Sequence, residues 1–228
     1  MIDETPKEIA KATAEVAKFL QKIFGQSAEQ VDGIVADQLK FVRFKRGMKI
    51  AEKARLFLAE KGREPRQVPL NVGVPLLTEG SLAEDEEMSD RWSALLASSA
   101  DSEGSPVPPS FPKILAELSG TDAKSLDAIG SFLSGAGKKE EEFTRVTVHA
   151  PRIKGIARVS DEEYQIGVDN LLRLNLVTPP NSSFPSFKKL EDESLPESVR
   201  SPSFLMNTKD SIGFTALGLR FWLACKPN

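Results

Sequence analysis

Apolar residues recur at spacings of three and four along much of the chain, which is the pattern of amphipathic helices. The first helix is predicted to begin at Thr5 and Pro6, which suit a helix N-terminus, and to end at Gly25. The periodicity resumes from residue 28 to residue 61, where one helix would be about 50 Å long. Gly47 is expected to kink or divide that helix, because glycine weakens a helix interior by about 1 kcal/mol.

The middle of the chain combines a proline-rich linker with a short apolar segment. The linker covers residues 65–69, and the apolar segment covers residues 70–77 with Pro75 inside it. Ser81 and Glu84 follow at the spacing of a capping box, in which each side chain accepts a hydrogen bond from the backbone N–H of the other residue. The next helix is therefore expected to begin at Ser81.

The second half of the chain continues with short periodic segments. Two helices are predicted over residues 110–118 and 121–133. Residues 140–158 fit either a helix or a strand, and Pro151 is expected to end whichever forms. A further capping box at Ser160 indicates the start of another helix.

The C-terminal pattern is that of a helix followed by a strand, a loop, a strand and a closing helix. Asn175 suits a left-handed helix end, and a short strand is predicted at residues 176–177. Residues 178–210 are rich in proline, serine and acid, so we expect a long, mobile loop. A returning strand at residues 212–214 and a helix capped by Thr215 complete an arrangement typical of a winged-helix module.

These elements predict a mainly α fold in two domains. The first is an N-terminal amphipathic helical domain over residues 1–101, which contains the long basic helix. A stretch rich in serine, glycine and proline, residues 102–110, is the predicted hinge. The second domain, over residues 111–228, is expected to be winged-helix-like with a small β-wing. The pattern is an analogy of fold and implies no activity.

The composition is poor in the residues that support metal and nucleophilic chemistry. Among 228 residues there is one histidine, His149, and one cysteine, Cys225, far apart in sequence and without ligand-like spacing. Cys225 lies on an apolar segment and is expected to be a small buried hydrophobe. We therefore predict no catalytic, metal-binding or cofactor-binding residue, no cofactor and no small-molecule substrate. The alternative enzyme, a metal-dependent nuclease, would use the acids near Asp85.

The formal net charge of −3 hides an asymmetry along the chain. Residues 40–66 hold ten basic and three acidic side chains, a net of +7, so the remainder carries −10. The basic stretch also carries aromatic side chains, and it provides the candidate interaction surface: Lys40, Phe41, Arg43, Phe44, Lys45, Arg46 and Lys49.

Three interpretations of this candidate surface stay open. It can be a solvated face packed against the acidic remainder of the chain. An anionic membrane surface or a partner helix would use its charge together with its aromatic side chains. Nucleic acid would be attracted by the charge.

The winged-helix-like module is poorly suited to bind a DNA groove. The helix predicted near residues 161–174 is acidic, so its partner is more readily a protein than DNA.

The segment from Val68 to Ser98 contains a more specific pattern. Ten residues at fixed spacings make up this pattern. They are Pro75, Leu76 and Leu77, then Ser81 and Leu82, then Asp85, then Trp92, and finally Leu95, Leu96 and Ala97. This pattern resembles the signature of the abortive infection alpha family of bacterial phage-defence proteins. The segments from Phe111 to Ala123 and from Thr215 to Phe221 resemble the continuation and the ending of that family.

The resemblance covers most of the chain from about residue 27 onward and implies a role in bacterial defence, in which infection leads to arrest or death of the host cell. It brings no catalytic motif, and Trp92 is expected to be a core anchor. We expect a non-enzymatic defence protein that acts through a protein partner, a membrane surface or self-association. The alternative is a nucleic-acid-binding winged-helix regulator. A cytoplasmic location is expected, with peripheral contact at the inner membrane surface as a variant, because no apolar stretch reaches the roughly 20 residues that a span needs.

Overall fold

The computed structural model describes residues 6–25, 41–179 and 211–227, which are mostly helical with a small antiparallel sheet. The prediction of a mainly α fold is therefore confirmed. The chain divides into two compact units: Met1–Glu117 with Ala224–Asn228, and Leu118–Leu223. The domain ranges 1–101 and 111–228 stay a prediction.

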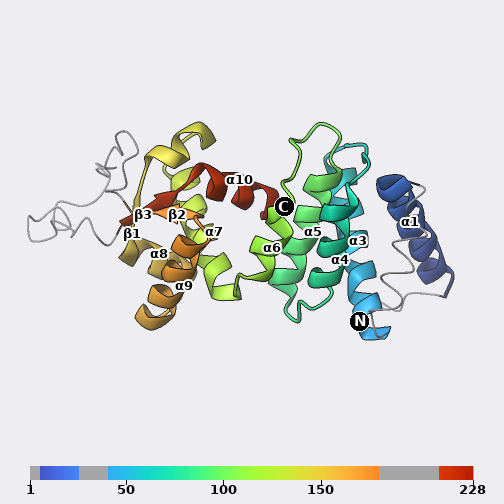
Figure 1. The fold of residues 1–228 in the computed structure, drawn as a ribbon, viewed down its shortest axis with the longest axis horizontal. Coiled ribbons are helices and arrows are strands. Elements are labelled where there is room, and N and C mark those ends of the chain that lie inside the picture. Colours follow the sequence, from blue (N-terminus) through green and yellow to red (C-terminus); the bar gives the residue numbers. More distant parts are fainter. Residues whose placement is uncertain (1–5, 26–40, 180–210, 228) are drawn as a thin grey trace, which may run out of the picture. The chain divides into compact units, whose positions relative to one another are not determined.

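The first unit is a group of packed helices. Its elements are α1 (Pro6–Phe24), α3 (Phe41–Glu60), α4 (Leu70–Gly80), α5 (Glu86–Ala100) and α6 (Ser110–Ala116). Figure 1 shows α3, α4 and α5 side by side, with α1 against α3. Because α3 and α4 both pack on α5, residues 91–97 of α5 are all buried. Trp92 lies among them, which confirms it as a core residue.

The prediction that Gly47 divides the long helix is wrong. Gly47 lies inside α3, which runs through it without a break. Pro75 lies inside α4, in the segment expected to be merely short and apolar. Proline disfavours a helix interior by about 3 kcal/mol, but the buried side chains of Val72, Leu76 and Leu77 hold this helix in the core. The part of the predicted helix over residues 28–40 lies outside the described residues.

The start of α5 also differs from the expectation. The N-cap is Asp85, whose Oδ1 accepts a hydrogen bond from the backbone N–H of Met88 at 2.7 Å. Ser81 is instead buried at the end of α4, where its hydroxyl donates to the carbonyl oxygen of Thr78 at 2.7 Å. The spacing of Ser81 and Glu84 matched a capping box, but Ser81 is the C-cap of α4, so it ends one helix instead of starting the next.

The second unit combines helices with the sheet. Its elements are α7 (Gly120–Gly135), the 3₁₀ helix η2 (Glu140–Arg145), β1 (Val148–His149), α8 (Ala150–Ala157), α9 (Asp161–Arg173), β2 (Val177–Thr178), β3 (Ser211–Phe214) and most of α10 (Ala216–Cys225). The strand order is β1-β3-β2, with antiparallel pairing throughout. Helix α7 packs against both α8 and α9.

Most local signals in this unit are confirmed. The capping box at Ser160 forms, Asn175 is left-handed with a φ of 55°, and the Thr215 hydroxyl accepts from the backbone N–H of Gly218. Pro151 is an exception, because it lies in the first turn of α8 and starts a helix rather than ending one. Of the predicted loop 178–210, residues 180–210 lie outside the described residues, and the winged-helix assignment stays a prediction.

Two residues of the last helix, α10, fix its position: the large side chain of Trp222 and Gly218, which has no side chain. Trp222 lies against Gly130 of α7, and its indole N–H donates to Asp127 at 2.9 Å. At Gly218 the backbone approaches so closely that a Cβ atom would lie 1.7 Å from the carbonyl oxygen of Leu176. Cys225 is buried at the end of α10, as expected for a small hydrophobe.

Candidate interaction surfaces

The basic candidate surface is spread around α3 rather than gathered on one side. Successive residues of a helix differ by about 100° in direction, so the cations at 43, 45 and 46 point three ways. Lys40 lies outside the described residues, and Phe41 is the first residue of α3. The structure therefore does not bring the seven residues together as one face.

The middle of α3 is held by ion pairs to its neighbours. Lys49 binds Glu86 of α5 at 2.7 Å, and Lys53 pairs with both Glu86 and Asp90. On another side of α3, Arg55 pairs with Glu15 of α1 at 3.0 Å. This part of the basic stretch packs against acids of the same unit, the first of the three open interpretations.

The pKa of Glu86 shows the strength of this pairing. Hydrogen bonds from Lys49 and then Lys53 lower the pKa of Glu86 from 4.5 to about 2. For Lys53 burial acts in the opposite direction, but its hydrogen bonds to Asp90 and Glu86 raise its pKa above 10.5. The charged forms are thus favoured on both sides of the contact between α3 and α5.

The acids near Asp85, the candidate metal ligands of a nuclease, have structural roles in this unit. Asp85 caps α5, while Glu86 and Asp90 hold lysines of α3. Within residues 6–25, 41–179 and 211–227, no group of three or more His, Cys, Asp or Glu side chains is arranged to hold a metal ion. His149 pairs with Ser211 in the sheet and precedes α8.

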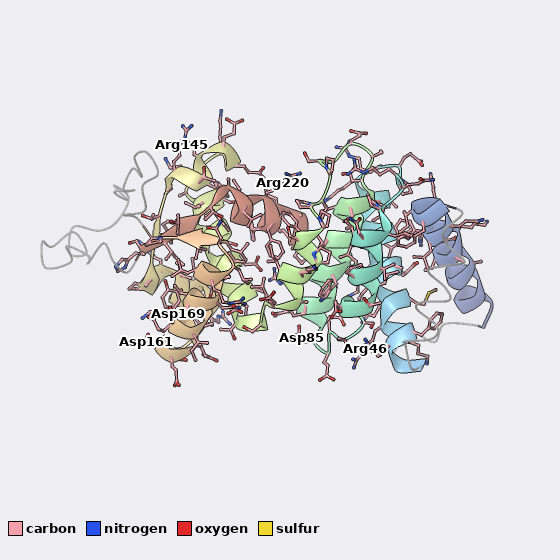
Figure 2. The ribbon with its side chains drawn as sticks, viewed as in Figure 1. Arg46, Asp85, Arg145, Asp161, Asp169 and Arg220 are labelled. Carbon is pink, nitrogen blue, oxygen red and sulfur yellow. The ribbon has the colours of Figure 1, made fainter. Side chains whose placement is uncertain are left out.

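The first turns of α3 differ from its middle in exposure. Phe44 is 42% exposed, Lys45 is exposed, and Arg46, which is labelled in Figure 2, is partly exposed. Arg43, in contrast, reaches the carbonyl oxygen of Thr78 at the end of α4, at 3.4 Å. We call Phe44, Lys45 and Arg46 the basic start of α3.

Helix α9 carries several exposed carboxylates. Its first turn carries Asp161, Glu162 and Glu163, and Asp169 follows two turns later (Figure 2). The backbone N–H of Ser160 bonds to Glu163 and lowers the pKa of its carboxyl group, so this acid is charged at neutral pH.

The apolar residue Ile166 lies between two of these carboxylates, Glu162 and Asp169, on one side of α9. Ile166 is 64% exposed, the largest exposed fraction among the large apolar side chains of the described residues. Sequence reasoning missed it, although Tyr164, Val168 and Leu171 form the buried stripe and place Ile166 on the other side of the helix. We call Glu162, Ile166 and Asp169 the acidic face of α9.

None of the helices in the described ranges has the length and apolar character needed to cross a membrane. In a comparison with known protein families, the family model for abortive infection alpha aligns with residues 38–225. No curated protein and no solved structure matches the chain. Because the matched region covers most of the 228 residues, the resemblance seen in the sequence is confirmed, and the chain belongs to the abortive infection alpha family of defence proteins.

Proposed function

We propose that this chain defends bacteria against phage by associating with a protein rather than by catalysing a reaction. The observation that carries the proposal is the acidic face of α9, where Ile166 stands 64% exposed between carboxylates. Ile166 offers a partner protein apolar surface to bury, and the carboxylates beside it offer charge to pair. The membership in the abortive infection alpha family supplies the biological setting.

The roles of the acids at α5 support a non-enzymatic mechanism. A hydrolytic metal site needs carboxylates that are free to converge on one ion. Asp85 accepts a helix-capping hydrogen bond, and Glu86 accepts hydrogen bonds from two lysines. Asp85 is therefore committed to capping α5, and Glu86 to the contact between α5 and α3.

A nucleic-acid-binding regulator is the alternative, and the order of elements favours it. The second unit runs α7, β1, α8, α9, β2, β3, with the sheet order β1-β3-β2. Winged-helix modules have this order of helices and strands, and in them the helix at the position of α9 enters the DNA groove. Charge opposes this alternative, because Glu162 and Asp169 would face phosphate. Salt-sensitive retardation of duplex DNA by the full chain would favour the regulator.

The proposal is tested by phage plating on cells with and without the gene, using I166E as the test variant. Ile166 is largely exposed, so the substitution removes the docking side chain at little cost to folding. Wild type is expected to reduce plaque counts, and I166E is expected to recover at least a tenth of the unprotected count.

The matched control is I156E, which alters an isoleucine that is 46% exposed on α8. It is expected to protect as wild type does. Unchanged plaque counts with wild type across a broad phage panel would contradict a defence role. Full protection by I166E would exclude α9 as the effector surface.

A further inference from the structure

We propose that the acidic face of α9 binds a basic amphipathic helix of another protein, in which an apolar side chain lies between two cations. This inference rests on the proposed function, because it names the chemistry of the partner that docks at the same surface. It draws on the exposure of Ile166, on the charges beside it and on the contacts of the other acids of α9.

The acidic face of α9 is a single row on the uncovered side of the helix. Glu162, Ile166 and Asp169 are spaced by four and three residues, so their side chains follow one line along the helix. The buried residues Tyr164 and Leu171 lie on the opposite side. At a rise of about 1.5 Å per residue, the row is about 10 Å long, which corresponds to two helical turns.

Two other acids of α9 are engaged within the same unit. Asp161 pairs with Lys154 of α8. Glu163 completes the capping box with Ser160 at the start of the helix. These contacts give Asp161 and Glu163 roles in the fold, so neither is needed to explain what the exposed row does.

The carboxylates on either side of Ile166 have a different setting. Glu162 and Asp169 are both exposed, and no ion pair among residues 6–25, 41–179 and 211–227 includes either of them. Asp169 accepts a hydrogen bond from the neutral side chain of Gln165 at 3.3 Å, which leaves its charge in place. With Ile166 64% exposed, the row offers a partner one apolar side chain between two negative charges.

The partner with the matching chemistry is a basic amphipathic helix. Two lysine or arginine side chains seven residues apart on a helix have the same separation as Glu162 and Asp169, because both helices have the same rise per residue. A leucine or isoleucine between these cations covers Ile166 from water, and the two ion pairs set the register of the contact. Phosphate is repelled by the same carboxylates, so nucleic acid does not fit this row.

The basic stretch of this chain does not supply the pattern. The basic start of α3 consists of consecutive residues, which point about 100° apart around the helix. Arg43 and Lys49 turn instead to α4 and α5. A cation, an apolar residue and a second cation do not fall in one row there, so the helix that fits α9 belongs to another protein.

Binding of two labelled synthetic helices to the full chain, followed by fluorescence anisotropy, tests this partner chemistry. The lysine peptide is an alanine-rich helix with lysine, leucine and lysine at the spacings of the α9 row, and the glutamate peptide has glutamate in place of both lysines. Wild type is expected to bind the lysine peptide about tenfold more tightly than the glutamate peptide, and added salt is expected to weaken this binding. The variant I166S is expected to bind the lysine peptide about tenfold more weakly than wild type, because the leucine loses its apolar contact.

The decisive variant is E162K/D169K, which reverses both charges of the row. It is expected to prefer the glutamate peptide, and neither loss of folding nor a general change in net charge produces such a reversal. The matched control is E140K/E141K, which makes the same change in net charge at two exposed acids of η2 in the same unit. The control is expected to keep the preference of wild type for the lysine peptide.

Equal binding of the two peptides by wild type, an unchanged preference in E162K/D169K, or a reversed preference in the control would overturn the proposal. Binding of duplex DNA by wild type that I166S weakens would also overturn it, since the row would then take nucleic acid. If I166E loses phage protection while wild type does not bind the lysine peptide, the partner chemistry is overturned and the proposed function stands. A chain that prefers the lysine peptide as expected but protects against no phage would support the contact and contradict the proposed function.

Discussion

Single residues decide how closely the elements of this fold approach one another. At Gly218 the backbone of α10 passes the residue that precedes β2 with no room for a side chain, since a Cβ atom would lie 1.7 Å from the carbonyl oxygen of Leu176. The atom in the way belongs to the backbone, which cannot turn aside as a flexible side chain can. Residue 218 must therefore be glycine, because the backbone at Leu176 leaves no space for a side chain.

The variant G218A is expected to lower the free energy of unfolding by about 2–4 kcal/mol, because the backbone must shift to admit the methyl group. The control is G155A, since a Cβ atom at Gly155 on α8 meets nothing within 4 Å. Alanine there is expected to leave stability unchanged or raise it by up to about 1 kcal/mol. Urea unfolding followed by tryptophan fluorescence measures both, and equal effects of the two variants would contradict the steric account.

Local signals at single residues were predictable where they depend on neighbours in sequence. The caps at Ser160 and Thr215 and the left-handed Asn175 were all expected from short patterns, and all are present. The position of Ser81 could not be predicted in this way, because its burial at the end of α4 depends on packing between helices. Ile166 differs from Ser81, because the apolar stripe of Tyr164, Val168 and Leu171 already placed it on the uncovered side of α9.

At the scale of elements, the pairing of α3 with α5 is the contact that best explains the uneven charge of the chain. Lys49 and Lys53 on one helix meet Glu86 and Asp90 on the other, with Glu86 shared between both lysines. The composition showed that opposite charges exist in the sequence, but only the fold shows which ones meet. Pro151 shows the same limit, since it was expected to end an element and instead lies in the first turn of α8.

This pairing predicts a particular dependence of stability on pH. The pKa of Glu86 is about 2 in the folded chain and about 4.5 when unfolded, so its contribution is complete above about pH 4.5 and is lost as pH falls toward 2. The contribution is expected to be about 0.5–1 kcal/mol, because the side chain is 61% exposed and solvent screens the pair.

The comparison of wild type with E86Q by urea unfolding, from about pH 6 to about pH 2, checks this expectation. Wild type is expected to be more stable at the upper end, and the difference is expected to shrink as the medium becomes acidic. The variant E84Q, at an exposed carboxylate before α5, serves as control. A difference between wild type and E86Q that stays constant over this range would contradict the assigned role of Glu86.

At the scale of the whole molecule, the fold class and the family could be predicted from the sequence. The residues of the candidate surface could be predicted only in part. Helical periodicity and the apolar signature around Trp92 depend on repeated local features, and both are confirmed. The seven residues proposed for the basic surface were chosen by position along the chain. In the fold, Arg43 and Lys49 turn to neighbouring helices, and Phe44, Lys45 and Arg46 remain exposed or partly exposed.

We propose that this member of the abortive infection alpha family protects by associating with a protein rather than by catalysis, and that the infected cell dies before the phage spreads. The most direct test is the density of cultures that carry the wild-type chain after infection at low and at high ratios of phage to cells. The account predicts survival at the low ratio, where few cells die and the phage does not spread, and collapse at the high ratio, with I166E cultures collapsing at both. Survival at the high ratio, or wild-type collapse at both, would contradict it.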